Sequence, residues 1–228
     1  DRIKRNKKLG LLGINIGPNK DSSDRLNDYL IGLKTFYDDA DYITINISSP
    51  NTENLRTFHE GDKLQDLLKS IMEERKNLKS NIPIAVKVSP DISEDQVSQI
   101  SEILLEHEIK AIIVSNTSEA TRDKLSNIQR HQKGGLSGKP IEEKSNILIN
   151  EFYKLLKGKI KIIGVGGVDS GQSAYDKFIA GADFVQLYTG MVFNGPNIAG
   201  IIKKELKELL IRDGVKNYTE IIGNKTLS

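Results

Sequence analysis

Residues 161–167 have the sequence Lys-Ile-Ile-Gly-Val-Gly-Gly, a short apolar run that ends in closely spaced glycines. Within it, residues 161–165 have the length and the β-branched content of a buried strand. Similar apolar runs occur along the rest of the chain, at residues 11–16, 42–47, 84–88, 111–115 and 184–187. None of them alternates strictly between apolar and polar residues, which is typical of strands buried on both faces of a parallel sheet.

Amphipathic segments separate these runs, with apolar residues spaced three and four apart. We expect helices at residues 24–37, 64–78, 141–157, 173–180 and 201–210, and a further helix that opens at Ser93. Ser93 and Gln96 have the spacing of a capping box, and Gly158 and Gly181 follow two of the segments as helix-ending glycines. Because strands and helices alternate along the chain, the order predicts an α/β fold with right-handed crossovers.

The position of the glycines favours a barrel over an open doubly wound sheet. An open sheet often carries a glycine-rich dinucleotide fingerprint after its first strand, but residues 13–17 lack the third glycine and Pro18 follows them. The glycines suited to phosphate come late, at residues 164–167, with a second candidate contact at residues 188–190. Barrels often bind phosphate with the loops after their last two strands. We therefore expect a (β/α)₈ TIM barrel with about six of its eight βα units in this chain and the first two absent.

Composition limits the function. We expect residues 1–228 to form a single barrel domain, and the net charge of +2 comes from interspersed acidic and basic residues, which gives no support for nucleic-acid binding. The chain has no cysteine, so disulfides, thiolate catalysis and metal–thiolate centres within it are excluded. The histidines, His59, His107 and His131, lie far apart in sequence, and we expect surface positions and no metal site. No apolar run has the length of a membrane span, so the chain taken alone is expected to be soluble.

Polar residues follow the expected strands where those strands end, which is where barrels carry their functional groups. The set contains asparagines, hydroxyl groups and one lysine, with neither a carboxylate nor a histidine: Asn15, Asn46, Ser49, Asn51, Lys87, Ser115, Asn116, Thr117, Tyr188 and Thr189. Such groups suit a planar heterocycle with carbonyl and N–H edges, or an anion held by hydrogen bonds. They do not suit metal hydrolysis or glycoside cleavage. Any one of the asparagines is equally well explained as a turn residue.

Lys87 lies within an expected strand buried on both faces, so it needs an anionic or acceptor partner or must lose its charge. An ion pair with a neighbouring strand and a flavin that becomes anionic on reduction both satisfy this condition.

Residues 133–140 carry glycines that could bring backbone N–H groups against a ligand, and Pro140 suits a helix start. A flexible connector would have the same composition.

At these residues the sequence resembles the class 2, quinone-dependent dihydroorotate dehydrogenase family. The matching blocks occur in the order of the family: GINIGPNK (13–20), YITINISSPNTENLR (42–56), IAVKVSPD (84–91), IIVSNTS (112–118), GGLSGKP (134–140), IIGVGGVDSG (162–171) and FVQLYTGMVFNGP (184–196). NISSPNT (46–52) and GGLSGKP are together highly specific. The resemblance implies an FMN barrel that oxidises dihydroorotate to orotate in pyrimidine (UMP) biosynthesis and passes the electrons to a quinone.

The resemblance also assigns roles. Ser49 would be the catalytic base that takes the C5 proton while a hydride leaves C6 for the flavin, with Thr52 as a candidate relay; class 1 relatives carry Cys here. The positions that would hold orotate are Asn46, Asn51, Asn116 and Thr117. The positions that would hold FMN are Asn15, Lys87, Ser115, Ser137, Gly138, Gly166, Gly167, Tyr188 and Thr189, the last four at its phosphate. Residues 49–61 resemble the mobile lid of the family.

Some features depart from the family pattern. Glu53 and Asn54 stand where the family commonly has a residue followed by Gly, and Ser115 and Ser118 stand where Thr is common. The first two barrel strands, and the helices that dock on the bacterial cytoplasmic or mitochondrial inner membrane, would precede residue 1.

Two alternatives remain open: a fragment without activity of its own, and another FMN barrel reductase of the dihydropyrimidine or dihydrouridine type. Those reductases more often use Cys for proton transfer.

Overall fold

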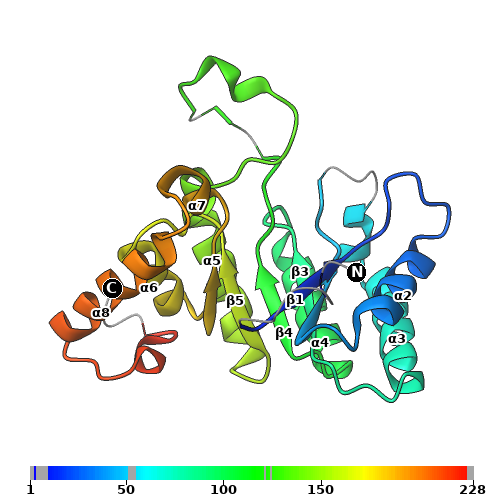
Figure 1. Cartoon of the computed structure of the whole chain (residues 1–228). Helices are drawn as coiled ribbons and strands as arrows, with labels where there is room; N and C mark the ends of the chain where they lie inside the picture. The colour runs from blue at the N-terminus through cyan, green and yellow to red at the C-terminus, as the bar shows by residue number, and fades with distance from the viewer. Residues whose placement is uncertain (1–2, 4–9, 51–54, 121, 124, 225–228) are drawn as a thin grey trace.

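The computed structural model describes residue 3 and residues 10–50, 55–120, 122–123 and 125–224. Within this part of the chain, six parallel strands form one sheet in the order of the sequence (Figure 1). The strands are β1 (Gly13–Ile16), β2 (Tyr42–Asn46), β3 (Ile84–Val88), β4 (Ala111–Val114), β5 (Lys161–Val165) and β6 (Phe184–Gln186). Each of them lies within a run expected from the sequence, which overestimated four of the strands by one or two residues.

Helices follow the strands. They are α2 (Arg25–Phe36), α3 (Gly61–Asn77), α4 (Glu94–Glu106), α5 (Glu142–Leu156), α6 (Gly171–Ala180), α7 (Thr189–Asn194) and α8 (Ile198–Arg212). Helix α4 begins where predicted, because the Ser93 and Gln96 side chains form the capping box. Helix α6 begins two residues earlier than predicted, because Ser170 rather than a later residue caps it. The short helix α7 was not predicted.

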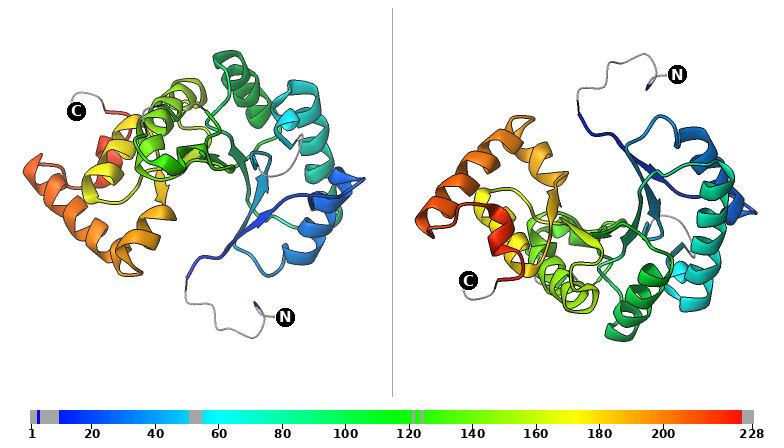
Figure 2. Two further views of the ribbon diagram at one scale, coloured as in Figure 1. Left: turned by 90° about the horizontal axis from the view of Figure 1, so that it is seen from above. Right: turned by 90° about the horizontal axis from the view of Figure 1, so that it is seen from below.

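The strands curl around an axis and the helices cover the outer face (Figure 2). In β2, β3 and β4 both faces are covered, and consecutive residues such as Ile43, Thr44 and Ile45 are all buried. The expectation of burial on both faces is wrong for β1, β5 and β6, where more of the residues are exposed or half-buried because these strands lie at or next to an edge of the sheet. In the described chain β1 and β6 form the two edges of the sheet and are not paired with each other. The result is a curled partial (β/α)₈ barrel, as the sequence predicted.

The core has two parts. A large cluster fills the space between the sheet and α2 to α5, and includes Leu33, Ile45 and Ile149. A smaller cluster joins α6 to α8 and includes Tyr175 and Ile198. Because the two clusters hold the strands and helices in place, the loops at the C-terminal strand ends have a fixed base on which to carry a site.

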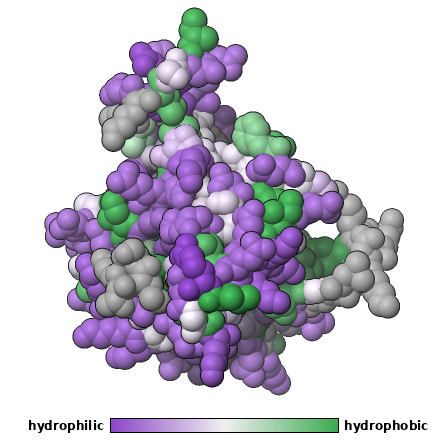
Figure 3. Space-filling model, turned by 90° about the vertical axis from the view of Figure 1, so that its left-hand side faces the viewer, coloured by the Kyte–Doolittle hydropathy of each residue, from purple (hydrophilic) through white to green (hydrophobic). Residues whose placement is uncertain are grey.

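The face of the molecule in Figure 3 is mostly hydrophilic, and its hydrophobic residues lie in separate small groups. This agrees with helix faces that carry interspersed charges.

The loop between β4 and α5 projects beyond the strand ends (Figure 1) and includes the short 3-10 helix η2 (Ile128–His131). None of the described helices is both long and apolar enough to cross a membrane.

Candidate active site

A cavity of about 250 Å³ lies at the C-terminal ends of the later strands. Its walls come from β3, from the end of β5, from the segments after β4, β5 and β6, and from residues just before and at the end of the 3-10 helix η3 (Lys139–Ile141). The residues are Lys87, Ser115, Asn116, Thr117, Ser137, Gly138, Ile141, Val165, Gly166, Gly167, Val168, Leu187, Tyr188, Thr189 and Gly190. Every predicted flavin residue except Asn15 is in this set, together with two of the predicted substrate residues.

The remaining predicted residues lie elsewhere. Asn15 is exposed on β1, and Asn46 lies at the end of β2 beside Lys87 of β3 in the sheet register. Ser49 is half-buried in the loop after β2 and does not line the cavity. Asn51 and Thr52 fall outside the described residues. The structure therefore brings the predicted flavin residues other than Asn15 into one cavity, with Asn116 and Thr117 in the same lining.

Glycines bring the backbone close to the cavity after β5 and β6. Gly166 and Gly167 have φ angles of +112° and +81°, which L side chains rarely adopt. A Cβ on Gly167 would lie 2.4 Å from the Cβ of Glu142, and a Cβ on Gly190 would lie 2.4 Å from the carbonyl oxygen of Val168. Only glycine fits these positions. The bare backbone of such a turn suits an anion such as phosphate.

Lys87 supplies a cation to the cavity wall. Its side chain is half-buried, and burial lowers its pKa. Within the described part of the chain its ammonium makes no hydrogen bond and no ion pair, so the ion pair with a neighbouring strand that the sequence left open is not found there. A partly buried amine without a protein partner is therefore available to a ligand in the cavity.

Ser48 joins two of the predicted substrate residues. Its hydroxyl donates to Asn46 Oδ1 at 2.8 Å and accepts from Asn116 Nδ2 at 2.9 Å. Asn116 Oδ1 in turn accepts from the backbone N–H of Thr117 at 2.8 Å. These bonds hold the side chains of β2 and the loop after β4 in a fixed relation, and they leave each asparagine amide with hydrogen-bonding capacity for a ligand. The sequence singled out Ser49 but not its buried neighbour Ser48.

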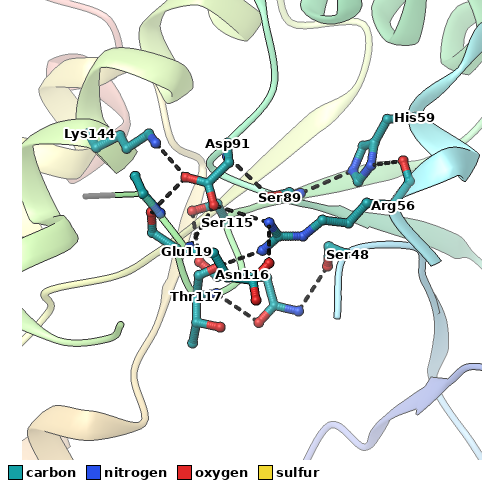
Figure 4. A network of polar contacts seen from close by, with 12 residues as sticks. Ser48, Arg56, His59, Ser89, Asp91, Ser115, Asn116, Thr117, Glu119 and Lys144 are labelled. Carbon is teal, nitrogen blue, oxygen red and sulfur yellow. Dashed lines mark hydrogen bonds and ion pairs between the residues drawn. The ribbon is translucent and has the colours of Figure 1, made fainter. Parts of the chain in front are cut away.

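Asp91 forms the centre of a polar network beside this cluster (Figure 4). Its carboxylate pairs with Arg56 Nη1 at 3.2 Å and with the ammonium of Lys144 at 2.5 Å. It also accepts from Ser118 Oγ at 2.6 Å and from the backbone N–H of Glu119 at 2.7 Å. Asp91 thus joins the loop after β3 to the 3-10 helix η1 (Leu55–His59), to the loop after β4 and to α5.

Opposing effects set the pKa of Asp91. Burial raises it, but the hydrogen bonds from Lys144, Ser118 and the Glu119 N–H outweigh burial, so the pKa is below its ordinary value. The carboxylate is therefore ionised throughout the neutral range. Arg56 extends the network to the substrate side, because its Nη2 donates to the carbonyl oxygen of Thr117 at 3.2 Å.

His59 is buried in this network, with only 1% of its surface exposed. Its Nδ1 lies 2.9 Å from the carbonyl oxygen of Arg56, and its Nε2 lies 3.2 Å from the backbone nitrogen of Ser89. Since a carbonyl only accepts and an N–H only donates, the ring must be neutral, with its proton on Nδ1. Burial is the main cause that lowers its pKa, and the Arg56 charge adds to it.

The network corrects two expectations. The strand-end rim was expected to hold neither a carboxylate nor a histidine, yet Asp91 and His59 both lie beside it. His59 was expected at the surface and is buried, and His107 is only half-buried. His131 is exposed, as expected. Asp91 could have been found from its place shortly after β3. His59 could not, because nothing in its local sequence shows that η1 folds against the loop after β3.

Comparisons with known proteins give the family. A family model described as dihydroorotate dehydrogenase matches residues 2–210. The chain belongs to the dihydroorotate dehydrogenase family. Among curated relatives, a dihydroorotate dehydrogenase (quinone) of Bartonella tribocorum is 44% identical over 225 residues, covering 96% of this chain and 62% of the relative. One of the same name from Agrobacterium fabrum is 40% identical and covers 97% of this chain.

Solved structures of the family agree. Dihydroorotate dehydrogenase of Eimeria tenella, in complex with ferulenol, superposes with a TM-score of 0.91 at 33% identity, covering 98% of this chain and 64% of that one. Its ligand-free form superposes with a TM-score of 0.90. This chain spans about three fifths of the length of the curated relatives it matches.

Proposed function

We propose that this chain carries the FMN and dihydroorotate sites of a quinone-dependent dihydroorotate dehydrogenase, which oxidises dihydroorotate to orotate in pyrimidine biosynthesis. The observation that carries the proposal is the cavity that Lys87, which has no partner among the described residues, lines together with Gly166 and Gly167, the glycine turn after β5. Family membership supports the reaction, since relatives with this name cover nearly all of the chain.

The cavity residues fit FMN. At one end, Gly166, Gly167 and Gly190 line the cavity without side chains, and the positive φ angles of Gly166 and Gly167 form a turn whose backbone suits the phosphate. Thr189 Oγ1 and Ser137 Oγ, 3.0 Å apart, add hydroxyl groups beside it. Towards β3, Lys87 provides the positive charge that suits a flavin ring when it gains electrons. We assign these residues to FMN; Asn15 stays a prediction.

FMN, when bound, supplies the hydride acceptor. The protein must then bind the pyrimidine ring, exclude water and remove the C5 proton. We assign proton removal to Ser49, a hydroxyl that acts as a base only in a polarised setting with a relay for its own proton. Thr52, the candidate relay, lies outside the described residues.

The asparagines are the proposed substrate contacts. A dihydropyrimidine ring has alternating carbonyl and N–H groups, and an asparagine amide can pair with both. Asn116 uses one N–H for Ser48 and its oxygen for the Thr117 N–H, so its second N–H is left for the substrate. Asn46 likewise accepts from Ser48 and keeps its amide donors. We expect the substrate ring to be bound jointly by Asn46, Asn51, Asn116 and Thr117.

We further propose that the electrons pass to a quinone, the acceptor in the names of the curated relatives. Quinones of this type are lipid-soluble, so an enzyme that reduces them must act at a membrane surface. We accordingly propose that the whole protein is membrane-associated, through a segment outside the residues described.

Anaerobic spectroscopy tests the proposal. The purified chain, reconstituted with FMN, should bind flavin and lose its absorbance near 450 nm, a general property of oxidised flavins, when dihydroorotate is added. Dihydrouracil, which lacks the carboxylate, is the matched control and should leave the flavin oxidised. Flavin binding with bleaching by dihydrouracil alone would favour a dihydropyrimidine reductase, and failure to bind flavin would refute the proposal for this chain.

A further inference from the structure

Lys177 on α6 is completely buried, with none of its surface exposed. Its Nζ donates to Ser145 Oγ at 3.1 Å and to Asn146 Oδ1 at 2.8 Å, and both partners are neutral. Among the residues that the structure describes, no carboxylate lies within ion-pair distance of it. Burial lowers the pKa of Lys177 to about 8, so it is still mainly charged at neutral pH.

Contacts place this amine directly behind the glycine turn. A Cβ on Gly164 would lie 3.0 Å from Cδ of Lys177, so the side chain runs against the backbone of β5. Ser145, which accepts from Lys177, donates its own proton to the carbonyl oxygen of Val165 at 2.6 Å. A hydrogen-bonded chain therefore leads from the ammonium to the Val165–Gly166 peptide, whose N–H belongs to the turn on the cavity wall.

A buried ammonium that has only neutral partners is unfavourable for folding. An apolar side chain of the same length would avoid the desolvation cost, and such replacements are often neutral or stabilising. The nearby charges do not explain its presence. Glu142 raises the pKa of Lys177 but is itself paired with Lys139 at 2.5 Å, Asp176 contributes less, and Lys139 lowers it. Within the described residues the cation thus lacks a paired counter-ion, and its hydrogen-bonded chain leads to a turn suited to an anion.

We propose that Lys177 supplies the positive charge that makes the cavity select a phosphorylated flavin over riboflavin. This inference rests on the proposed function, since it assigns the glycine turn to the FMN phosphate. The phosphate carries a charge between −1.5 and −2 at neutral pH. Lys177 attracts it from behind the turn, and by polarising Ser145 and the Val165–Gly166 peptide it strengthens the Gly166 N–H as a donor. Lys177 is a positioning residue and does not touch the reacting atoms.

The test compares flavins that differ only in the phosphate. Dissociation constants of FMN and riboflavin are measured by flavin fluorescence at pH 7, for the unaltered chain and for Lys177→Met. We expect FMN binding to weaken by about tenfold or more, as for loss of a charge interaction in a protein interior, while riboflavin binding stays the same. The melting temperature should not fall, because methionine fills the same space without a charge to bury.

Two further variants make the result specific. Lys177→Gln keeps a hydrogen-bond donor without the charge and should lose the same preference for FMN. Lys161→Met removes an exposed lysine from the other end of β5, where it pairs with Asp183, and should bind both flavins as the unaltered chain does. Equal weakening of both flavins, or no change in either, would overturn the role of Lys177. If the unaltered chain binds neither flavin, the proposed function itself fails, and this inference with it.

Discussion

The guanidinium of Arg56 lies 3.2 Å from the carboxylate of Asp91 and, through its other terminal nitrogen, 3.2 Å from the carbonyl oxygen of Thr117. Arg56 belongs to η1, Asp91 to the loop after β3 and Thr117 to the loop after β4. One side chain thus connects the described end of the candidate lid to a proposed substrate residue. A change at Arg56 is therefore expected to reach the substrate site.

For Arg56→Gln, we expect the free energy of unfolding to fall by about 1–3 kcal/mol, because the change leaves a mostly buried carboxylate with one cation fewer. Orotate binding should weaken, since the loop that carries Thr117 loses a tether. Urea denaturation and orotate titration measure the two effects. Lys34→Gln, which breaks the more exposed Lys34–Glu74 pair, is the control and should alter neither. Unchanged orotate affinity in Arg56→Gln would contradict the link.

His59 should make stability depend on pH. Its pKa in the folded chain is below that of the exposed side chain, so the unfolded chain binds the proton more readily. The stability contributed by neutral His59 is complete above about pH 6.5 and is lost as the pH falls from there through the lower folded pKa. A proton on Nε2 would also face the N–H of Ser89.

We expect His59→Gln to flatten the fall in melting temperature between about pH 7 and pH 5, because glutamine takes up no proton in this range. His131→Gln is the control, since His131 is exposed in the folded chain, and its profile should follow that of the unaltered protein. Identical profiles for all three proteins would show that His59 is not a source of the pH dependence.

Ser49→Ala tests the proposed base. We expect the variant to bind FMN normally and to reduce it with dihydroorotate about 100-fold to 10,000-fold more slowly, the usual contribution of a positioned base. Stopped-flow absorbance measures the rate. Ser126→Ala changes an exposed serine in the loop before η2 and should be as fast as the unaltered chain. Near-normal reduction in Ser49→Ala would refute the assignment.

Lys87→Met tests the cation on the cavity wall. Because the ammonium has no protein partner in the described residues, we expect little loss of stability but weaker flavin binding or a lower flavin reduction potential. The potential reports the charge directly, since Lys87 would stabilise the reduced flavin. Lys110→Met, on an exposed lysine just before β4, is the control. Unchanged affinity, potential and rate would place Lys87 away from the flavin.

The strands and the glycine turn were predictable because they depend on residues close together in sequence. The apolar runs of β3 and β5 coincide with the strands to the residue, and the Ser93–Gln96 capping box opens α4 as expected. The helix α7 was missed, since Thr189 to Asn194 form too short a segment to show a helical period. The sequence predicted that the strand ends meet at one rim, but it did not give the register that sets Asn46 beside Lys87.

The sequence by itself determined the alternation of strands and helices, the family and ten of the fifteen residues that line the cavity, because periodicity and short motifs carry this information locally. Only the tertiary structure decided which other side chains form hydrogen bonds or ion pairs around the cavity residues. Arg56 and Thr117 are 61 residues apart, Arg56 and Asp91 are 35 apart, and Lys177 and Ser145 are 32 apart. Such pairs meet only when the barrel brings successive strand ends to one rim, and a buried charge such as Lys177 has no local pattern that distinguishes it from a solvated lysine on a helix.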